Sequence, residues 1–118
     1  MRLIKIAVAS VNATVGATTS NVDRCIALAK QMDAEDVTLA AFPEQVVGGY
    51  SPEDLVQWEG FVVSQRAALE RFASDTQKLR TVFVIGLVVG VGGDLYNCAA
   101  LGTKISLQMV HYVETRES

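Results

Sequence analysis

The stretch VTLAAFPE, residues 37–44, decides the fold of this chain. Its apolar run stops at Pro43, which has no backbone N–H to donate and restricts the residue before it. A run that is too short for a helix and ends in this way predicts a buried strand. Glu44 follows directly, at the carboxyl end of the strand, where the active sites of α/β sheets gather.

Strand and helix patterns alternate on both sides of this stretch. Residues 3–9 predict a first buried strand, and apolar residues at helical spacing predict a helix that ends within residues 33–36. Ser20 or Asn21 is the predicted cap of that helix. After Glu44, we expect a short helical turn at 53–56 and an amphipathic helix at 61–78. This second helix presents Phe61, Val62, Gln65, Ala68, Leu69 and Phe72 on one face.

The last third of the chain predicts strands. Residues 81–89 give the strongest strand signal, 90–94 a glycine hairpin turn, 95–101 its returning strand and 105–113 a final strand. Gly86, inside the first of these strands, indicates a bulge or a close backbone approach. The order predicts an α/β fold, a layered sheet covered by helices with an antiparallel pair near its end.

Composition excludes several classes of function. The 118 residues have room for one domain or part of a larger one, and half of them are apolar, which disfavours disorder. The net charge of −3 is spread along the chain without a basic stripe, so nucleic acid is not an expected partner. No segment approaches the ~20 apolar residues of a membrane span, so no membrane partner is expected. Cys25 and Cys98 have no metal-ligand spacing and predict reduced thiols in a cytoplasmic protein with no metal site.

Glu44 is the first candidate for chemistry. A carboxylate that is partly desolvated at a strand end has a raised pKa, which suits it to proton transfer. The alternative is a structural role, either capping the next turn or pairing with Arg24 or Lys30.

The other candidates have stronger structural explanations. The glycines at 86–93 do not match a dinucleotide fingerprint, because the chain continues as a strand and does not open a helix. Cys25 and Cys98 lie among apolar residues without a base and predict packed core positions. His111, the only histidine, lies on the last predicted strand, where a structural or solvent-facing role is expected.

Residues 41–55, AFPEQVVGGYSPEDL, resemble the first signature of the nitrilase, or carbon–nitrogen hydrolase, superfamily. Residues 6–12, Gly16, Asn21 and the Tyr96-Asn97 pair resemble other elements of that family. The GYSPEDL segment is similar to the glutaminase domain of glutamine-dependent NAD synthetases, with Ser51 in place of the usual first proline.

The resemblance implies part of an α-β-β-α sandwich hydrolase that uses a Glu-Lys-Cys triad. Glu44 would be the general base, with substrate-pocket positions at Tyr50, Tyr96 and Asn97. The substrate would be a small amide, glutamine, and the domain itself would need no cofactor, whereas an absent synthetase domain would use ATP. Family members commonly associate, so a homo-oligomer is possible by analogy.

The chain departs from the family pattern over residues 102–118. When the family pattern is counted on from Lys104, His111 falls at the position of the catalytic lysine. Neither cysteine of this chain has the sequence context of the family's nucleophile. We therefore expect residues 1–118 to be the N-terminal portion of a carbon–nitrogen hydrolase domain, inactive alone. The alternative is a non-catalytic α/β interaction module that reuses the fold. A flavodoxin-like nucleotide-binding domain is a weaker third hypothesis.

Overall fold

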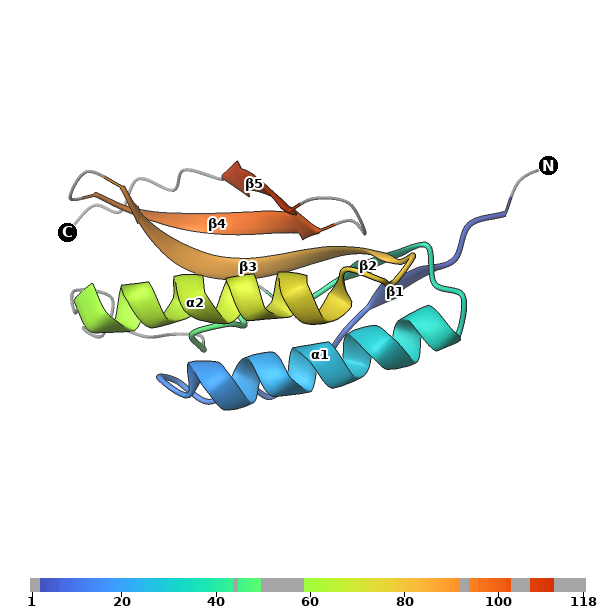
Figure 1. Ribbon diagram of the computed structural model, residues 1–118, viewed down its shortest axis with the longest axis horizontal. Helices are drawn as coiled ribbons and strands as arrows, with labels where there is room; N and C mark the ends of the chain where they lie inside the picture. The colour runs from blue at the N-terminus through green and yellow to red at the C-terminus, as the bar shows by residue number, and fades with distance from the viewer. Residues whose placement is uncertain (1–2, 44, 50–58, 92–93, 103–106, 112–118) are drawn as a thin grey trace.

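The strands follow one another across a single sheet in their chain order. A computed structural model describes residues 3–43, 45–49, 59–91, 94–102 and 107–111, and within these ranges five strands form the order β1-β2-β3-β4-β5 (Figure 1). The first three strands are parallel, and the last two join them as an antiparallel pair. Their bounds are β1 Ile6–Val8, β2 Leu39–Ala41, β3 Val82–Val91, β4 Asp94–Gly102 and β5 Leu107–His111. The predicted element order and the antiparallel end are thus confirmed.

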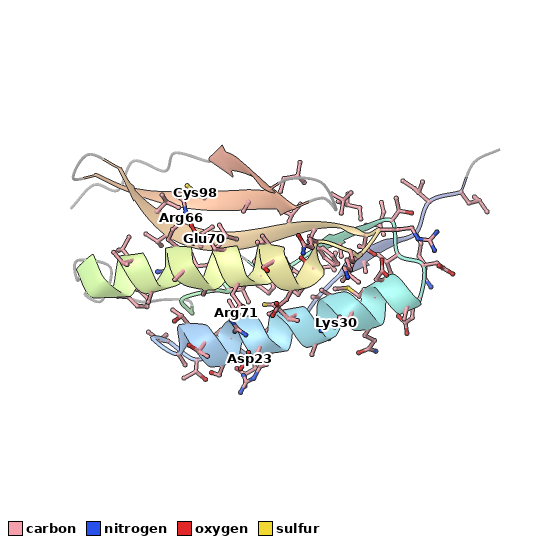
Figure 2. All side chains as sticks on the ribbon, viewed as in Figure 1. Asp23, Lys30, Arg66, Glu70, Arg71 and Cys98 are labelled. Atoms are coloured by element: carbon pink, nitrogen blue, oxygen red, sulfur yellow. The ribbon has the colours of Figure 1, made fainter. Side chains whose placement is uncertain are left out.

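Both helices lie on the same face of the sheet (Figure 1). Helix α1, Thr18–Ala34, links β1 to β2, and helix α2, Glu59–Thr76, lies between β2 and β3. The connections from β1 to β2 and from β2 to β3 have the same handedness and move across the sheet in the same direction, so their helices lie on the same face. Asp23 of α1 and Arg71 of α2 point toward each other across the helix pair, with 2.7 Å between Oδ1 and Nη1 (Figure 2). Within the described ranges, the second face of the sheet has no helix over it.

The core lies between the two helices and the covered face of the sheet. Three phenylalanine rings form its centre, with centroid separations of 5.8 Å for Phe42–Phe72, 5.7 Å for Phe72–Phe83 and 6.1 Å for Phe42–Phe83. Phe72 meets the other two rings edge to face, and such pairs add to the stabilisation from burial. Phe42 directly follows β2, so the core holds the chain immediately before the candidate catalytic stretch.

The opposite face of the sheet carries apolar side chains that nothing in the described structure covers. Ile6 and Val8 are 60% and 83% exposed, whereas Ala7 between them packs against the core, as the two-residue period of a strand requires. The strand register continues this row across β2 and β3 through the partly buried Leu39, Ala41, Val82 and Val84. The helices therefore cover one face of a sheet that is apolar on both.

The predicted cap of the first helix is wrong. Helix α1 begins at Thr18 with Ala17 in the cap position, and no side chain caps it. Asn21 lies inside the helix, fully buried, because its amide is used in tertiary hydrogen bonds to two loops. Ser20 donates from its hydroxyl to the Ala17 carbonyl and accepts nothing from a free helix N–H. The side chain of Asn21 therefore binds two loops and does not cap its own helix.

The observed parallel strands are shorter than predicted at their edges. The first strand, predicted over residues 3–9, is Ile6–Val8, because its partner β2 offers only Leu39–Ala41 for pairing. The last strand, which is antiparallel and predicted over 105–113, is described over Leu107–His111, and the rest of its predicted range lies outside the described residues. The second helix and the hairpin lie within two or three residues of their predicted bounds. The helical turn predicted at 53–56 lies outside the described residues.

Asp33 at the end of α1 holds the start of β3. Its carboxylate accepts hydrogen bonds from the backbone N–H groups of Arg80 at 2.8 Å and Thr81 at 3.0 Å, and from the Thr81 hydroxyl at 3.2 Å. Partial burial works to raise the pKa of this carboxyl, but these donors and the Arg80 charge outweigh it and hold the pKa below its usual value.

We expect Asp33→Asn to destabilise the chain in a pH-dependent way. A folded-state pKa below the unfolded value stabilises the fold above the unfolded pKa, and this stabilisation is lost as pH falls through the folded pKa. The substitution should lower the free energy of unfolding by about 1–2 kcal/mol at neutral pH. The difference from the unsubstituted chain should shrink below about pH 4. Urea unfolding at several pH values measures this difference in the free energy of unfolding, with Asp75→Asn on the exposed side of α2 as the control. A loss that is constant with pH would contradict the charge-based explanation.

Candidate functional site

The chain turns sharply directly after β2. Phe42 extends the sheet by one residue, donating its N–H to the Val84 carbonyl at 2.8 Å. The Val46 N–H bonds to the Pro43 carbonyl at 3.2 Å, and the Gly49 N–H to the Gln45 carbonyl at 2.9 Å. Gln45 has a φ of 53°, which a residue with a side chain adopts rarely. Residues 45–49, called the Gln45–Gly49 turn below, are therefore tightly wound at the carboxyl end of β2.

Asn21 joins this turn to the loop that follows β1. Its Nδ2 donates to the Thr14 carbonyl at 2.8 Å and to the Val47 carbonyl at 3.1 Å, while its Oδ1 accepts from the Thr14 N–H at 2.8 Å. The Gly16 N–H donates to the Gly48 carbonyl at 2.9 Å. The loops at the carboxyl ends of two adjacent parallel strands are thus joined by hydrogen bonds of the buried Asn21 side chain. This end of the strands is where this class of sheet places ligand sites.

Both glycines of the turn lie very close to their neighbours, and at Gly49 the neighbouring atoms are backbone. A Cβ at Gly49 would lie 2.6 Å from Cα of Val15, and the residue has a φ of 87°. A Cβ at Gly48 would lie 2.8 Å from side-chain atoms of both Gln65 and Phe61. The turn is therefore packed between the first loop and helix α2.

The turn also binds the free edge of β3. The Val47 N–H donates to the Gly86 carbonyl at 3.2 Å, and Val88, two residues on, donates its N–H to Oε1 of Gln65 at 2.9 Å. The predicted alternatives for Gly86 are a bulge and a close approach. The β3–β4 register is unbroken there, with Gly86 opposite Ala99, so the bulge is wrong and the backbone contact from the turn is observed.

Of the predicted site residues, Glu44 and Tyr50 lie outside the described residues, as does all of the GYSPEDL segment after Gly49. Pro43 and Gln45, which flank Glu44, are described and lie at the carboxyl end of β2. The structure therefore locates the stretch in which Glu44 stands, and its predicted role as general base stays a prediction.

Tyr96 and Asn97 lie on β4, opposite Val89 and Val88 of β3. Their backbone is described and their side chains are not, so their pocket role also stays a prediction. Asn97 is opposite Val88, whose N–H donates to Oε1 of Gln65. His111 lies on β5 opposite Cys98, which places it one strand further from β2.

Both cysteines are core residues, as predicted. Cys25 is fully buried in α1, and burial raises the pKa of its thiol to about 12. Cys98 is buried in β4, and burial raises its pKa as well. A nucleophilic cysteine needs an accessible thiolate, so neither environment suits that role.

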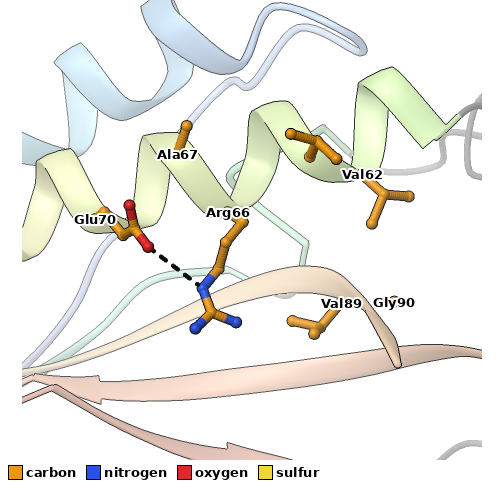
Figure 3. Close-up of a pocket in the computed structure, with 7 residues that line it drawn as sticks. Val62, Arg66, Ala67, Glu70, Val89 and Gly90 are labelled. Carbon is orange, nitrogen blue, oxygen red and sulfur yellow. Dashed lines mark ion pairs between the residues drawn. The ribbon is translucent and has the colours of Figure 1, made fainter. Parts of the chain in front are cut away.

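A groove of about 310 Å³ runs between the outer side of α2 and the far end of β3. Figure 3 shows Arg66 and Glu70 at this groove, with 3.7 Å between Nε and Oε1, beside Val62, Val89 and Gly90. Both charged side chains are mostly exposed, and such a pair contributes little. None of the lining residues belongs to the Gln45–Gly49 turn, so this groove is not the candidate site.

Two features were searched for in the described ranges, a cluster of metal-ligating side chains and a helix that could cross a membrane. These ranges contain no group of three or more His, Cys, Asp or Glu side chains placed to hold a metal ion. Neither described helix combines the length and apolar character that crossing a membrane requires.

Sequence reasoning missed the roles of Asn21 and Gln65. Both are polar residues with no exposed surface on otherwise apolar helix faces. That interruption was visible in the sequence, since buried polar groups are nearly always hydrogen-bonded. Their partners were not visible, because they lie 26 residues away at Val47 and 23 residues away at Val88.

Comparison with known proteins agrees with this geometry. The family model of carbon–nitrogen hydrolases matches residues 5–104. A glutamine-dependent NAD(+) synthetase from Xylella fastidiosa (strain Temecula1) is 36% identical over 99 residues, which are 83% of this chain and 18% of the synthetase. A synthetase of the same description from Thermotoga maritima is 30% identical over 101 residues, 86% of this chain and 17% of its own length. The chain thus spans less than a fifth of these relatives.

Solved structures show the same fold. A glutamine-dependent NAD(+) synthetase from Cytophaga hutchinsonii superimposes with a TM-score of 0.82 at 23% identity, covering 89% of this chain and 18% of that one. An amidase from Nesterenkonia sp. superimposes with a TM-score of 0.74 at 19% identity, covering 96% and 43%. A variant of that amidase shows Michael addition of acrylamide at its active-site cysteine. With 100 of its 118 residues matched by the family model, this chain belongs to the carbon–nitrogen hydrolase family.

Proposed function

We propose that this chain supplies the general base of a glutamine-hydrolysing domain of the kind found in glutamine-dependent NAD synthetases. Glu44 takes the proton from a cysteine thiol, the thiolate attacks the carboxamide carbon, ammonia leaves, and water releases the acyl group. A lysine stabilises the oxyanion that develops. The observation that carries the proposal is the tightly wound turn after β2, in a chain whose sequence around Glu44 resembles the family's first signature.

In this proposal the chain does not turn over alone. Its two cysteines are both buried core thiols, so the nucleophile must come from a segment outside residues 1–118. His111 at the register of the lysine is a weak substitute, because it lies on β5 with β4 between it and β3. In the same proposal the chain itself uses no cofactor, and ATP would be used by the absent synthetase domain. Two free thiols agree with a cytoplasmic location.

The uncovered sheet face supports an incomplete domain. Ile6 and Val8 on this face are exposed and the apolar residues beside them on β2 and β3 are only partly buried, and a sheet that is apolar on both faces needs a layer on each. In an α-β-β-α sandwich this second layer is another sheet. We propose that the missing segments, with the lysine and cysteine, cover this face.

A chimera tests the function. Residues 1–104 of this chain would replace the matching segment of the Xylella fastidiosa synthetase, and ammonia release from glutamine would be measured for the chimera, the parent synthetase and the isolated chain. We expect activity from the chimera and none from the isolated chain. A chimera that is folded but inactive would overturn the proposed function, and robust hydrolysis by the isolated chain would overturn the incomplete triad.

The alternative is a non-catalytic interaction module, for which an exposed sheet edge or an unpaired helix face would be the binding surface. This alternative predicts a cooperative, monomeric chain that binds little apolar dye. Strong dye binding and aggregation of the isolated chain, together with an active chimera, would favour the hydrolase fragment instead.

A further inference from the structure

Strand β3 is longer than its parallel partner. Pairing with β2 ends at Ala41 opposite Val84, whereas β3 continues to Val91. Beyond that point the β2-facing edge of β3 has no strand beside it in the described structure. Its polar groups are bound by other parts of the chain: the Gly86 carbonyl by Val47, and the Val88 N–H by Oε1 of Gln65 at 2.9 Å. A side-chain carbonyl accepts as a backbone carbonyl does, so Gln65 takes the place of a strand residue here.

The other side of the Gln65 carboxamide contacts the turn. A Cβ at Gly48 would lie 2.8 Å from both Cδ and Nε2 of Gln65, so the Gly48 backbone packs directly on the amide. The Gln65 side chain is fully buried, which means that it cannot move aside into solvent. The carboxamide therefore lies between Val88 of β3 and Gly48 of the turn and contacts both, beside the direct hydrogen bond from Val47 to Gly86.

Two buried polar atoms have no hydrogen-bond partner among the described residues, the Nε2 of Gln65 and, in the turn, the Oε1 of Gln45. An apolar side chain of the same size would fill the space without leaving a buried donor unpaired, and buried unpaired groups are costly. The amide at position 65 thus does something that packing alone does not require, and the bond to Val88 is what it provides.

We propose that Gln65 is a positioning residue for the Gln45–Gly49 turn, and through the chain for Glu44. Its carboxamide sets the separation between the free edge of β3 and Gly48, and so determines where the turn is held after β2. The inference rests on the proposed function only for the role of Glu44 as base. The placement of the turn by Gln65 does not depend on it.

The test is made on the full chain by NMR, without turnover. Gln65→Met keeps the side-chain volume and removes the carboxamide. We expect the Val88 amide proton to exchange about tenfold faster or more, relative to the other amides of β3. We also expect the pKa of the Glu44 carboxyl, titrated in isotopically labelled protein, to move by about 0.5 or more.

Two matched variants separate positioning from general loosening. Gln65→Asn keeps the carboxamide but shortens the side chain by one methylene, so it should reproduce both effects, and it decides the question if Gln65→Met does not fold. Leu69→Val lies one turn further along α2, at an equally buried position, and should leave the Glu44 pKa and the Val88 exchange ratio unchanged.

An unmoved Glu44 pKa or an unchanged Val88 exchange ratio in the Gln65 variants would overturn the proposal. An equal shift of the Glu44 pKa in Leu69→Val would overturn it too, since any loosening of the core would then suffice. Failure of the proposed function appears separately, as a folded chimera that releases no ammonia while the NMR results stand.

Discussion

Replacing Glu44 by glutamine in the chimera is expected to lower kcat for glutamine hydrolysis by about 10³-fold. Glutamine keeps the size and shape of the side chain but cannot take the proton from the thiol. The KM should change much less, because the base acts on the nucleophile and not on the bound amide. Steady-state ammonia release at several glutamine concentrations separates the two parameters.

Glu70→Gln is the matched control for this variant. It makes the same chemical change on the exposed side of α2, where Glu70 is mostly exposed and forms a weak ion pair with Arg66. We expect its kcat to stay within about twofold of the unsubstituted chimera, the size of effect that distant surface changes produce. A Glu44→Gln chimera that keeps most of its activity would remove Glu44 from the role of base.

Gly49→Ala is expected to reduce the free energy of unfolding by about 2–5 kcal/mol, from the sum of backbone strain and steric overlap. The φ of 87° is unfavourable for any residue with a Cβ. The new methyl group would also lie 2.6 Å from Cα of Val15 and 2.9 Å from the carbonyl carbon of Thr14. Because both are backbone atoms, no side-chain rotation relieves the contact, and the loop after β1 must move away from the turn.

Chemical denaturation measures this loss, and Gly60→Ala is its control. Gly60 lies near the start of α2, and a Cβ added there would have nothing within 4 Å. Alanine at this position should be neutral or stabilising by up to about 1 kcal/mol. An unfolding midpoint for Gly49→Ala equal to that of the unsubstituted chain would show that the turn tolerates a side chain and is not held as described.

Local periodicity was sufficient for the order of elements. The apolar run that ends at Pro43, the helical spacing around Cys25 and the β-branched run before Gly90 each carry their information within a few residues. Strand ends were predicted less well, since a strand can extend only as far as its partner does. The three-residue β2 limits β1 to three residues, whatever the apolar run at 3–9 favours.

For the candidate site too, the features that depend on neighbouring residues could be predicted and those that depend on remote contacts could not. The position of Glu44 at a strand end follows from residues 37–44 alone, and the family resemblance of residues 41–55 adds its expected role. The buried thiols of Cys25 and Cys98 could be predicted because their neighbours are apolar. Asn21 instead has the local pattern of a helix cap, because capping is a local preference and its real partners are remote loops.

The sequence by itself determined the alternation of strands and helices, the antiparallel end and the place of Glu44 along the chain, because these depend on residues near one another. Only the tertiary structure decided that both helices share one face, leaving Ile6 and Val8 uncovered, and that Asn21 and Gln65 hold the turn after β2. The physical reason is that a buried amide forms hydrogen bonds with whichever groups lie next to it in space. The segments at Val47 and Val88 come near these helices only when the sheet has formed.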